Sequence, residues 1–358
     1  MLSLVLTLVV RRAAVWAGFL ARPVADRYHR GVVPLGGGIA IYVTIVLFVL
    51  GGAGAVKFVF AAGCLGRLWE RAGVEPADFM AKLNELWGVL LAATVLFALG
   101  LWDDIKHRGP LLKLLVQFGA ALVAVTLGRV RVELFIENPL ITSLLSALWI
   151  VIIVNAFNFL DNMDGLSAGI AVITTCILFV AAATSGQVFV GGLALVFVGA
   201  VLGFLVLNFP PAKIFMGDAG SMVVGFFVAM LTLRTTYYHQ AQSGRWYPVL
   251  MPLVVMAVPL YDFLSVTVLR ISQGKSPFVG DTQHFSHRLR KAGLSDVQTA
   301  LTLYLATLCT GLAGIFLYQV NLAGAILIFV QMVMVLCIIA VLESTANNAE
   351  IRNQNRCA

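Results

Sequence analysis

Long apolar runs alternate with short polar segments along nearly the whole chain. A helix needs roughly 17–25 apolar residues to cross a bilayer, and the runs are apolar on all sides, which favours helices over a membrane β-barrel. The pattern predicts an all-α polytopic membrane protein with about 10–11 transmembrane helices. We expect spans at 34–56, 86–102, 111–128, 139–158, 166–184, 188–209, 219–234, 247–269, 299–318 and 322–342.

The first twenty residues do not fit this pattern. They are apolar, but Arg11 and Arg12 stand at their centre, where each charge costs about 2.5–3.5 kcal/mol to insert. Either a short buried segment precedes an interfacial amphipathic helix from Arg11 onward, or a longer first span begins upstream of Met1. We expect one integral membrane domain over 1–358, with its core at 22–342 and a cytoplasmic tail at 343–358.

Composition supports the membrane class and narrows the partners. The chain is 60% hydrophobic and 11% charged, whereas soluble domains average about 25% charged residues. Its net charge of +7 suits anionic lipid and phosphate ligands, but no dense basic stripe of the nucleic-acid-binding kind is present. The five cysteines are scattered without a CxxC spacing, so we expect neither a disulfide framework nor a zinc site.

The positive charges orient the chain in the membrane. With the loop at 21–33 placed inside, the inner loops carry 14 Lys and Arg and the outer loops carry 8, as the positive-inside rule favours. The polar loops then all lie inside, so we expect the active site on the cytoplasmic face. These loops are 102–113, 155–165, 210–220 and 270–298.

The first polar cluster is the adjacent pair Asp103 and Asp104, at the inner end of a span. Neighbouring residues do not share a helix face, so we expect the two carboxylates to meet different partners. They either bind a metal or handle a proton, or they form a solvated helix end beside Lys106.

In the second cluster, polar side chains recur every three residues from a span into a turn, at Asn155, Asn158, Asp161 and Asp164. That spacing keeps them roughly on one side of a helix. Amide and carboxylate oxygens suit a hard cation such as Mg²⁺. Amide bonding between helices is the alternative for Asn155, but it explains the two aspartates poorly.

The third cluster is the glycine-rich loop from Lys213 to Ser221, which holds Asp218 between two apolar runs. A carboxylate in such a loop beside a lysine is typical of a metal–phosphate site, and a plain turn is the alternative. The fourth runs from Asp281 to Lys291 and contains His284, His287 and Arg288. It either grips a phosphate or rests on anionic lipid.

Two further features stay open. Asp262 lies inside a span, where an acid is a functional candidate by position, and a partner within the helix bundle explains it equally well. A basic loop from Arg27 leads into the glycines at 36–38. Their N–H groups meet an anion, or the glycines allow close helix packing.

Together these segments resemble the polyprenyl-phosphate N-acetylhexosamine-1-phosphate transferases of glycosyltransferase family 4. The resemblance covers the chain from about Arg22 to Arg290, and the shape of the histidine motif is closer to the group that uses UDP-GlcNAc than to the muramyl-pentapeptide branch. It rests on Pro34-Leu-Gly-Gly, Asp103-Asp104, Asn155-x-x-Asn158-Phe-x-Asp161-x-x-Asp164-Gly165-Leu166, Phe215-x-Gly217-Asp218-x-Gly-Ser221 and the His284 region.

The resemblance implies transfer of a sugar-1-phosphate, most simply GlcNAc-1-phosphate, from a UDP-sugar to undecaprenyl phosphate with release of UMP. It implies a multi-pass protein of the bacterial inner membrane, surrounded by lipid and compatible with a homodimer. Asn158 and Asp218 would hold Mg²⁺, which Mn²⁺ can replace. The implied catalytic acids are Asp103, Asp104, Asp161 and Asp164. The candidate substrate-binding residues are Asn155, Lys213, His284, His287 and Arg288.

Two positions depart from the family pattern. Asn162 stands where the family commonly has Gly, and Ser286 stands where it commonly has the middle His of its histidine motif. Another UDP-N-acetylhexosamine and UDP-MurNAc-pentapeptide remain alternative donors. A secondary transporter, which would carry its charges near the bilayer midplane, and a non-catalytic lipid-phosphate-binding scaffold are alternatives of another class.

Overall fold

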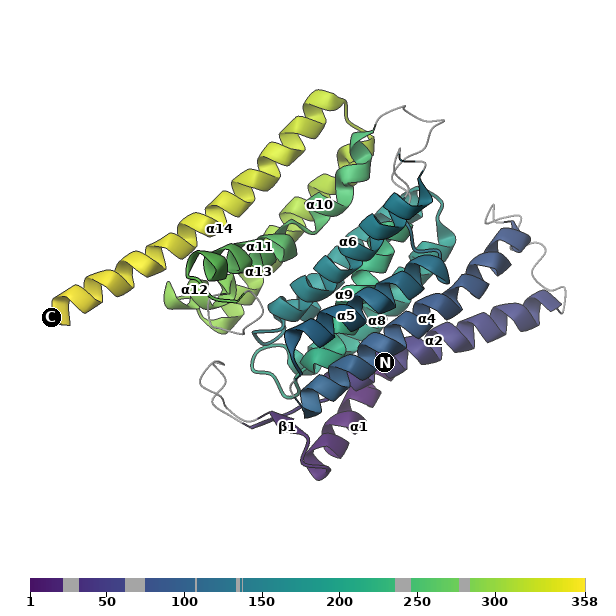
Figure 1. Ribbon diagram of the computed structural model, residues 1–358, viewed down its shortest axis with the longest axis horizontal. Helices are drawn as coiled ribbons and strands as arrows, with labels where there is room; N and C mark the ends of the chain where they lie inside the picture. The colour runs from purple at the N-terminus through teal and green to yellow at the C-terminus, as the bar shows by residue number, and fades with distance from the viewer. Residues whose placement is uncertain are drawn as a thin grey trace.

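The computed structural model describes residues 1–21, 32–61, 75–106, 108–132, 136, 138–235, 246–276 and 284–357. Helices make up nearly all of it (Figure 1). The helices are α1 (Leu2–Trp16), α2 (Gly37–Ala61), α4 (Pro76–Ile105), α5 (Pro110–Thr126), α6 (Pro139–Leu160), α7 (Leu166–Thr184), α8 (Val188–Asn208), α9 (Gly217–Arg234), α10 (Met251–Val255), α11 (Ala257–Ser272), α12 (Phe285–Lys291), α13 (Asp296–Ile315) and α14 (Leu322–Cys357). An antiparallel pair, β1 (Leu20–Ala21) and β2 (Val33–Pro34), and two 3₁₀ turns, η1 (Tyr247–Leu250) and η2 (Phe316–Tyr318), join them.

Eight helices in the described ranges are long and apolar enough to cross a membrane, or nine if the bent pair around Met256 is one span. This confirms the all-α polytopic class. The expected total of ten to eleven exceeds the count for two reasons. Helix α5 has only 17 residues, and the run expected as one span at 247–269 bends by 68° between Val255 and Ala257.

The N-terminal segment forms one helix, α1, that passes through Arg11 and Arg12 without a break. The interfacial helix expected to begin at Arg11 is therefore not a separate element. Helix α1 packs on α2 and α8 through buried Ser3 and Thr7. The Arg11 side chain donates from Nε to the carbonyl oxygen of Lys213 at 3.1 Å, so the charged part of α1 lies beside the 210–220 loop.

Helix α9 forms the centre of the bundle. Of its most apolar 18-residue stretch, 83% is buried inside the protein, whereas the corresponding share for α14 is 11%. Helix α9 packs on α2, α4, α6, α7 and α8, whereas α14 runs along one side and extends beyond the other helices (Figure 1). Small residues allow this density: a Cβ on Gly225 would lie 2.8 Å from Cα of Val154 on α6. The side chains at the first turn of α9 therefore rest on the most tightly packed part of the molecule.

Candidate active site

The acid–lysine cluster, which we define as Asp103, Lys113, Asn158 and Asp218, joins four helices. Lys113, in the first turn of α5, lies 2.5 Å from Oδ2 of Asp103 and 2.8 Å from Oδ2 of Asp218. Asn158 joins this group through Ser221 in the first turns of α9, whose hydroxyl accepts from the Asn158 amide at 2.9 Å. The end of α4, the end of α6 and the starts of α5 and α9 therefore meet at one place.

Asp103 is oriented by a second contact. Its Oδ1 accepts the backbone N–H of Arg108 at 2.7 Å, and the side chain is almost fully buried. The guanidinium of Arg108 in turn lies 3.8 Å above the ring of Trp102. The short connection between α4 and α5 thus fixes the Asp103 carboxylate against the Lys113 ammonium.

Asp104 has a different set of partners. Its two carboxylate oxygens accept the backbone N–H groups of Asp218 at 2.8 Å and Ala219 at 3.1 Å. The first N–H groups of a helix have no partner within the helix and carry its positive dipole end. Asp104 therefore caps α9 from the neighbouring helix, and the two adjacent acids do meet different partners, as the sequence predicts.

The start of α9 fits beside Asp104 only because its first residue, Gly217, has no side chain. Gly217 has φ +72°, and a Cβ there would lie 2.7 Å from Oδ2 of Asp104. The first glycines of α2 come equally close, since N–H groups of Gly37 and Gly38 donate to the carbonyl oxygens of Phe215 at 2.9 Å and Met216 at 3.0 Å. Of the two readings left open for these glycines, the contacts support close packing.

The amides of α6 have separate roles. Asn158 donates to Oγ of Ser221 at 2.9 Å and faces the cluster. Asn155, an expected substrate-binding residue, donates to Oε1 of Gln117 on α5 at 2.7 Å and to the carbonyl oxygen of Val151 at 2.8 Å. Asn155 is thus an interhelical amide contact in this structure.

The acid turn, residues 161–165, follows α6. Asp161 is the C-cap of α6, and Oδ2 of Asp164 accepts the N–H of Ala212 at 2.8 Å. Gly165 closes the turn at φ +71° and donates to Oδ1 of Asn208 at 3.1 Å. The turn is therefore tied to the loop that leads to Asp218.

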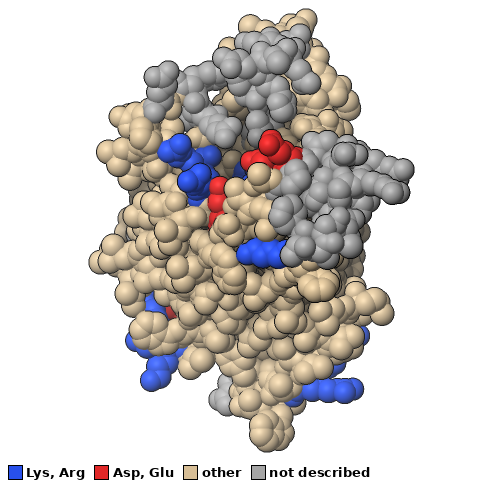
Figure 2. Space-filling model, turned by 90° about the vertical axis from the view of Figure 1, so that its right-hand side faces the viewer, with Lys and Arg blue, Asp and Glu red and all other residues tan. Residues whose placement is uncertain are grey.

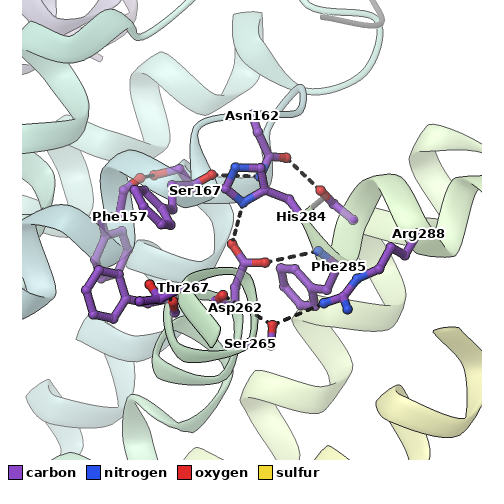
Figure 3. A network of polar contacts seen from close by, with 12 residues as sticks. Phe157, Asn162, Ser167, Asp262, Ser265, Thr267, His284, Phe285 and Arg288 are labelled. Atoms are coloured by element: carbon purple, nitrogen blue, oxygen red, sulfur yellow. Dashed lines mark hydrogen bonds and ion pairs between the residues drawn. The ribbon is translucent and has the colours of Figure 1, made fainter. Parts of the chain in front are cut away.

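The histidine network surrounds the start of α12 (Figure 3). Asp262, fully buried on α11, lies 3.0 Å from Nδ1 of His284 and accepts the N–H of Phe285 at 3.0 Å. Nδ1 of His284 therefore faces the Asp262 carboxyl group, and Nε2, on the other side of the ring, is left to face other groups. Asp262 thereby fixes the ring orientation of His284.

Arg288 turns toward other partners. Its Nη2 donates to Oγ of Ser265 at 3.1 Å and lies 3.3 Å from Oε2 of Glu343 on α14. Arg288, expected to bind substrate, is thus held between α11 and α14 by protein partners. The ring of His287 is buried, with its centroid 6.2 Å from that of His284.

Three further sequence expectations are not met by contacts in the described site. Lys213 is exposed and its backbone, rather than its side chain, makes the recorded contact with Arg11. Asp281 and the loop from Arg27 to Arg30 lie outside the described residues.

The sequence-based site set lacks Lys113, the residue that joins Asp103 to Asp218. A signal for it was present, since Lys113 is the one charge in the apolar run of α5. Within the described ranges, no three His, Cys, Asp or Glu side chains form a ready-made metal cluster. The oxygen-bearing groups that gather around one cationic point are those of Asp103, Asn158 and Asp218.

A cavity of about 1540 Å³ opens at the other end of the bundle. Figure 2 views that end, where basic and acidic side chains gather. Arg234, at the end of α9, lines the cavity and pairs with Glu85 at 2.6 Å. Sixteen residues of helix, roughly 24 Å at the α-helical rise, separate Arg234 from Asp218, so this cavity is not part of the candidate site.

Comparison with known proteins gives a consistent result. Glycosyl transferase family 4 matches residues 86–236. A Bacillus subtilis protein named "Probable undecaprenyl-phosphate N-acetylglucosaminyl 1-phosphate transferase" is 29% identical over 353 residues, which cover 96% of this chain and 90% of that protein. A Mycobacterium tuberculosis protein named "Decaprenyl-phosphate N-acetylglucosaminephosphotransferase" is 33% identical over 320 residues, covering 83% and 75%. An Escherichia coli protein named "Undecaprenyl-phosphate alpha-N-acetylglucosaminyl 1-phosphate transferase" is 26% identical over 321 residues, covering 85% and 78%.

Proposed function

The chain belongs to glycosyl transferase family 4, and we propose that it transfers N-acetylglucosamine-1-phosphate from UDP-N-acetylglucosamine to a polyprenyl phosphate and releases UMP. The names of its relatives support a phosphotransferase with a polyprenyl phosphate acceptor. The observation that carries the proposal is the meeting of Asp103, Lys113 and Asp218 at the ends of membrane helices. A lipid phosphate and a water-soluble nucleotide can both reach that level.

The chemistry needs little proton transfer. An oxygen of the lipid phosphate attacks the sugar-bound phosphorus of the donor, and the bond from that phosphorus to the bridging oxygen breaks, so that UMP leaves with the electron pair. A phosphate monoester has a second pKa of about 6, and the acceptor is therefore largely dianionic at neutral pH. A covalent enzyme intermediate and a strong general base are both unnecessary.

The chain's own residues divide the remaining work. The Lys113 ammonium can leave one of its two carboxylate partners and bind a phosphate oxygen, and it then balances negative charge at the reacting phosphate. Asp103 orients Lys113, and Asp104 holds the first turn of α9 so that Asp218 keeps its position. His284, fixed by Asp262, presents Nε2 to the donor side.

The residues present fit a magnesium ion. Mg²⁺ usually takes one or two protein carboxylates and completes its octahedron with water and substrate phosphate, and such a site needs no cluster of three protein acids. Asp218 and Asn158 would hold the ion, with Asp103 beside them. When bound, the ion would act as a Lewis acid on the diphosphate.

The direction of the site follows from charge. The loops that the sequence assigns to the inner side, among them those of the acid–lysine cluster, carry 14 Lys and Arg, and the loops assigned to the outer side carry 8. That bias supports a site that faces the cytoplasm, where UDP-sugars occur, in the inner membrane of a bacterium. The product would be the first lipid-linked sugar of a cell-envelope polysaccharide.

The test is UMP release by purified protein with polyprenyl phosphate and three donors: UDP-GlcNAc, a second UDP-N-acetylhexosamine, and UDP-MurNAc-pentapeptide. We expect release with UDP-GlcNAc only when acceptor and Mg²⁺ are both present, and its loss on chelation. Release with another donor alone would overturn the donor assignment. Acceptor binding without release would identify a scaffold, and uptake of an intact sugar by proteoliposomes would identify a transporter.

A further inference from the structure

Ser286 and Asn162, the two departures from the family pattern, touch each other. Ser286 on α12 is fully buried and donates from Oγ to Oδ1 of Asn162 at 2.6 Å. Asn162 donates from Nδ2 to the carbonyl oxygen of Phe159 at 2.6 Å. Dashed lines in Figure 3 mark the hydrogen bonds of Asn162 and of its neighbours in the histidine network. Because a carbonyl oxygen only accepts, this amide orientation alone satisfies both partners.

The pair links two parts of the site that belong to different elements. Asn162 lies in the acid turn between Asp161 and Asp164. Ser286 lies two residues after His284, in a helix of seven residues. The flanking side chains of α12 bond in other directions, since His284 meets Asp262 on α11 and Arg288 meets Ser265 and Glu343.

The two residues also match in size. Glycine at 162 has no side chain to reach α12. An imidazole at 286 would have to enter a position that is fully buried with a serine present, and close-packed interiors tolerate such an increase poorly. One change without the other would therefore leave either a buried hydroxyl or an amide without this bond, at a cost in stability.

We propose that Asn162 and Ser286 form a positioning pair, which sets the place of His284 relative to Asp161 and Asp164 and so aligns the donor-binding half of the site with the acid turn. The pair acts through these neighbours, without contact with the substrate. The inference rests on the proposed function for its kinetic consequence. On this view Asn162 and Ser286 are one coupled change that preserves the site, and they are not two independent signs of lost activity.

The kinetic test compares Asn162→Ala, Ser286→Ala and the double variant with the parent chain. Each single variant should lower kcat/KM for UDP-GlcNAc about tenfold, while KM for polyprenyl phosphate stays unchanged. The double variant should be no worse than the more damaged single variant. Thr232→Ala is the matched control, since it removes an interhelical bond to Trp149 of 2.9 Å at the far end of α9 and should leave both parameters unchanged.

Hydrogen–deuterium exchange in nanodiscs tests the pair without activity. Ser286→Ala should speed exchange of the amides at 161–165, and Asn162→Ala should speed exchange at 285–291, whereas Thr232→Ala should change neither. The pairing would be overturned if the loss of kcat/KM in the double variant equalled the product of the two single losses. It would also be overturned if each substitution changed amide exchange only in its own segment. If the parent released no UMP from any donor but the reciprocal exchange appeared, the proposed function would fail and the positioning pair would stand.

Discussion

The acid–lysine cluster and the histidine network are held in place by different means. The cluster sits where long helices touch backbone to backbone: a Cβ on Gly100 of α4 would lie 2.5 Å from Cα of Ala219 on α9. The network instead depends on side-chain bonds to the short helix α12, such as the 3.0 Å contact of Asp262 with His284. Both regions contain buried acids, but the cluster is held by close backbone approach of long helices and the network by side-chain hydrogen bonds.

The difference suggests a division of tasks. Moving a residue of the cluster requires moving a packed helix, and close packing opposes this. Each side-chain hydrogen bond of the network contributes only about 1 kcal/mol, so single substitutions can adjust it. We expect the cluster to carry the chemistry and the network to tune which donor is accepted.

The strongest test of the comparison is Asp218→Asn. The substitution removes the charge that Lys113 and the proposed Mg²⁺ share, and UMP release should fall by about a thousandfold. Asp78→Asn is the control, because Asp78 pairs with Lys82 at an exposed position on the opposite end of the bundle. Turnover of Asp218→Asn close to that of the parent would contradict the assignment of the cluster to chemistry.

Gly38→Ala tests the packing of the cluster. A Cβ at Gly38 would lie 2.3 Å from the backbone nitrogen of Gly220, so α2 and α9 must separate. The free energy of unfolding should fall by about 1–3 kcal/mol, seen as a lower melting temperature, and transfer should fall with it. Gly51→Ala in the same helix meets nothing within 4 Å and should unfold no earlier than the parent. Equal melting temperatures for the two variants would count against a rigid cluster.

Asp262→Asn tests the network. An amide has one oxygen, so it can accept from either His284 or the N–H of Phe285, and its NH₂ group then faces the other. We expect kcat/KM for the donor to fall about 10–100-fold, with a smaller change in melting temperature than Gly38→Ala produces. Ser265→Ala, which removes the hydroxyl that bonds Arg288 and the carbonyl oxygen of Asp262 but leaves the Asp262 carboxylate in place, is the control. Unchanged donor kinetics in Asp262→Asn would show that the orientation of His284 is not needed.

The smallest effect on transfer is expected for Glu343→Gln. Arg288 keeps its bond to Ser265, and glutamine can still accept a hydrogen bond, so transfer should change by less than about threefold. The melting temperature should fall, because a hydrogen bond to a charged partner contributes about 1.5–3 kcal/mol. Asp296→Asn, which breaks the pair with Arg290, is the control. A loss of transfer as large as that of Asp262→Asn would place Arg288 with the substrate rather than with α14.

Sequence periodicity predicted most of the fold but not its irregularities. The apolar runs locate the spans because burial in lipid depends on local composition. The bend at Met256 breaks a run that remains apolar throughout, and α4 begins at Pro76, ten residues before the expected start at 86. The bend leaves hydropathy unchanged, and the first turns of α4 are polar although helical, so an apolar pattern shows neither feature.

The sequence by itself determined that this is a multi-span membrane protein of glycosyl transferase family 4, with its acids and histidines at the ends of spans. Motif order and hydropathy are local properties, and they suffice for that. Only the tertiary structure decided the partners: Asp104 with α9, Lys113 between Asp103 and Asp218, and Asn162 with Ser286. A partner depends on how each helix is rotated and how closely its neighbour approaches, and both are set by packing between segments far apart in the chain.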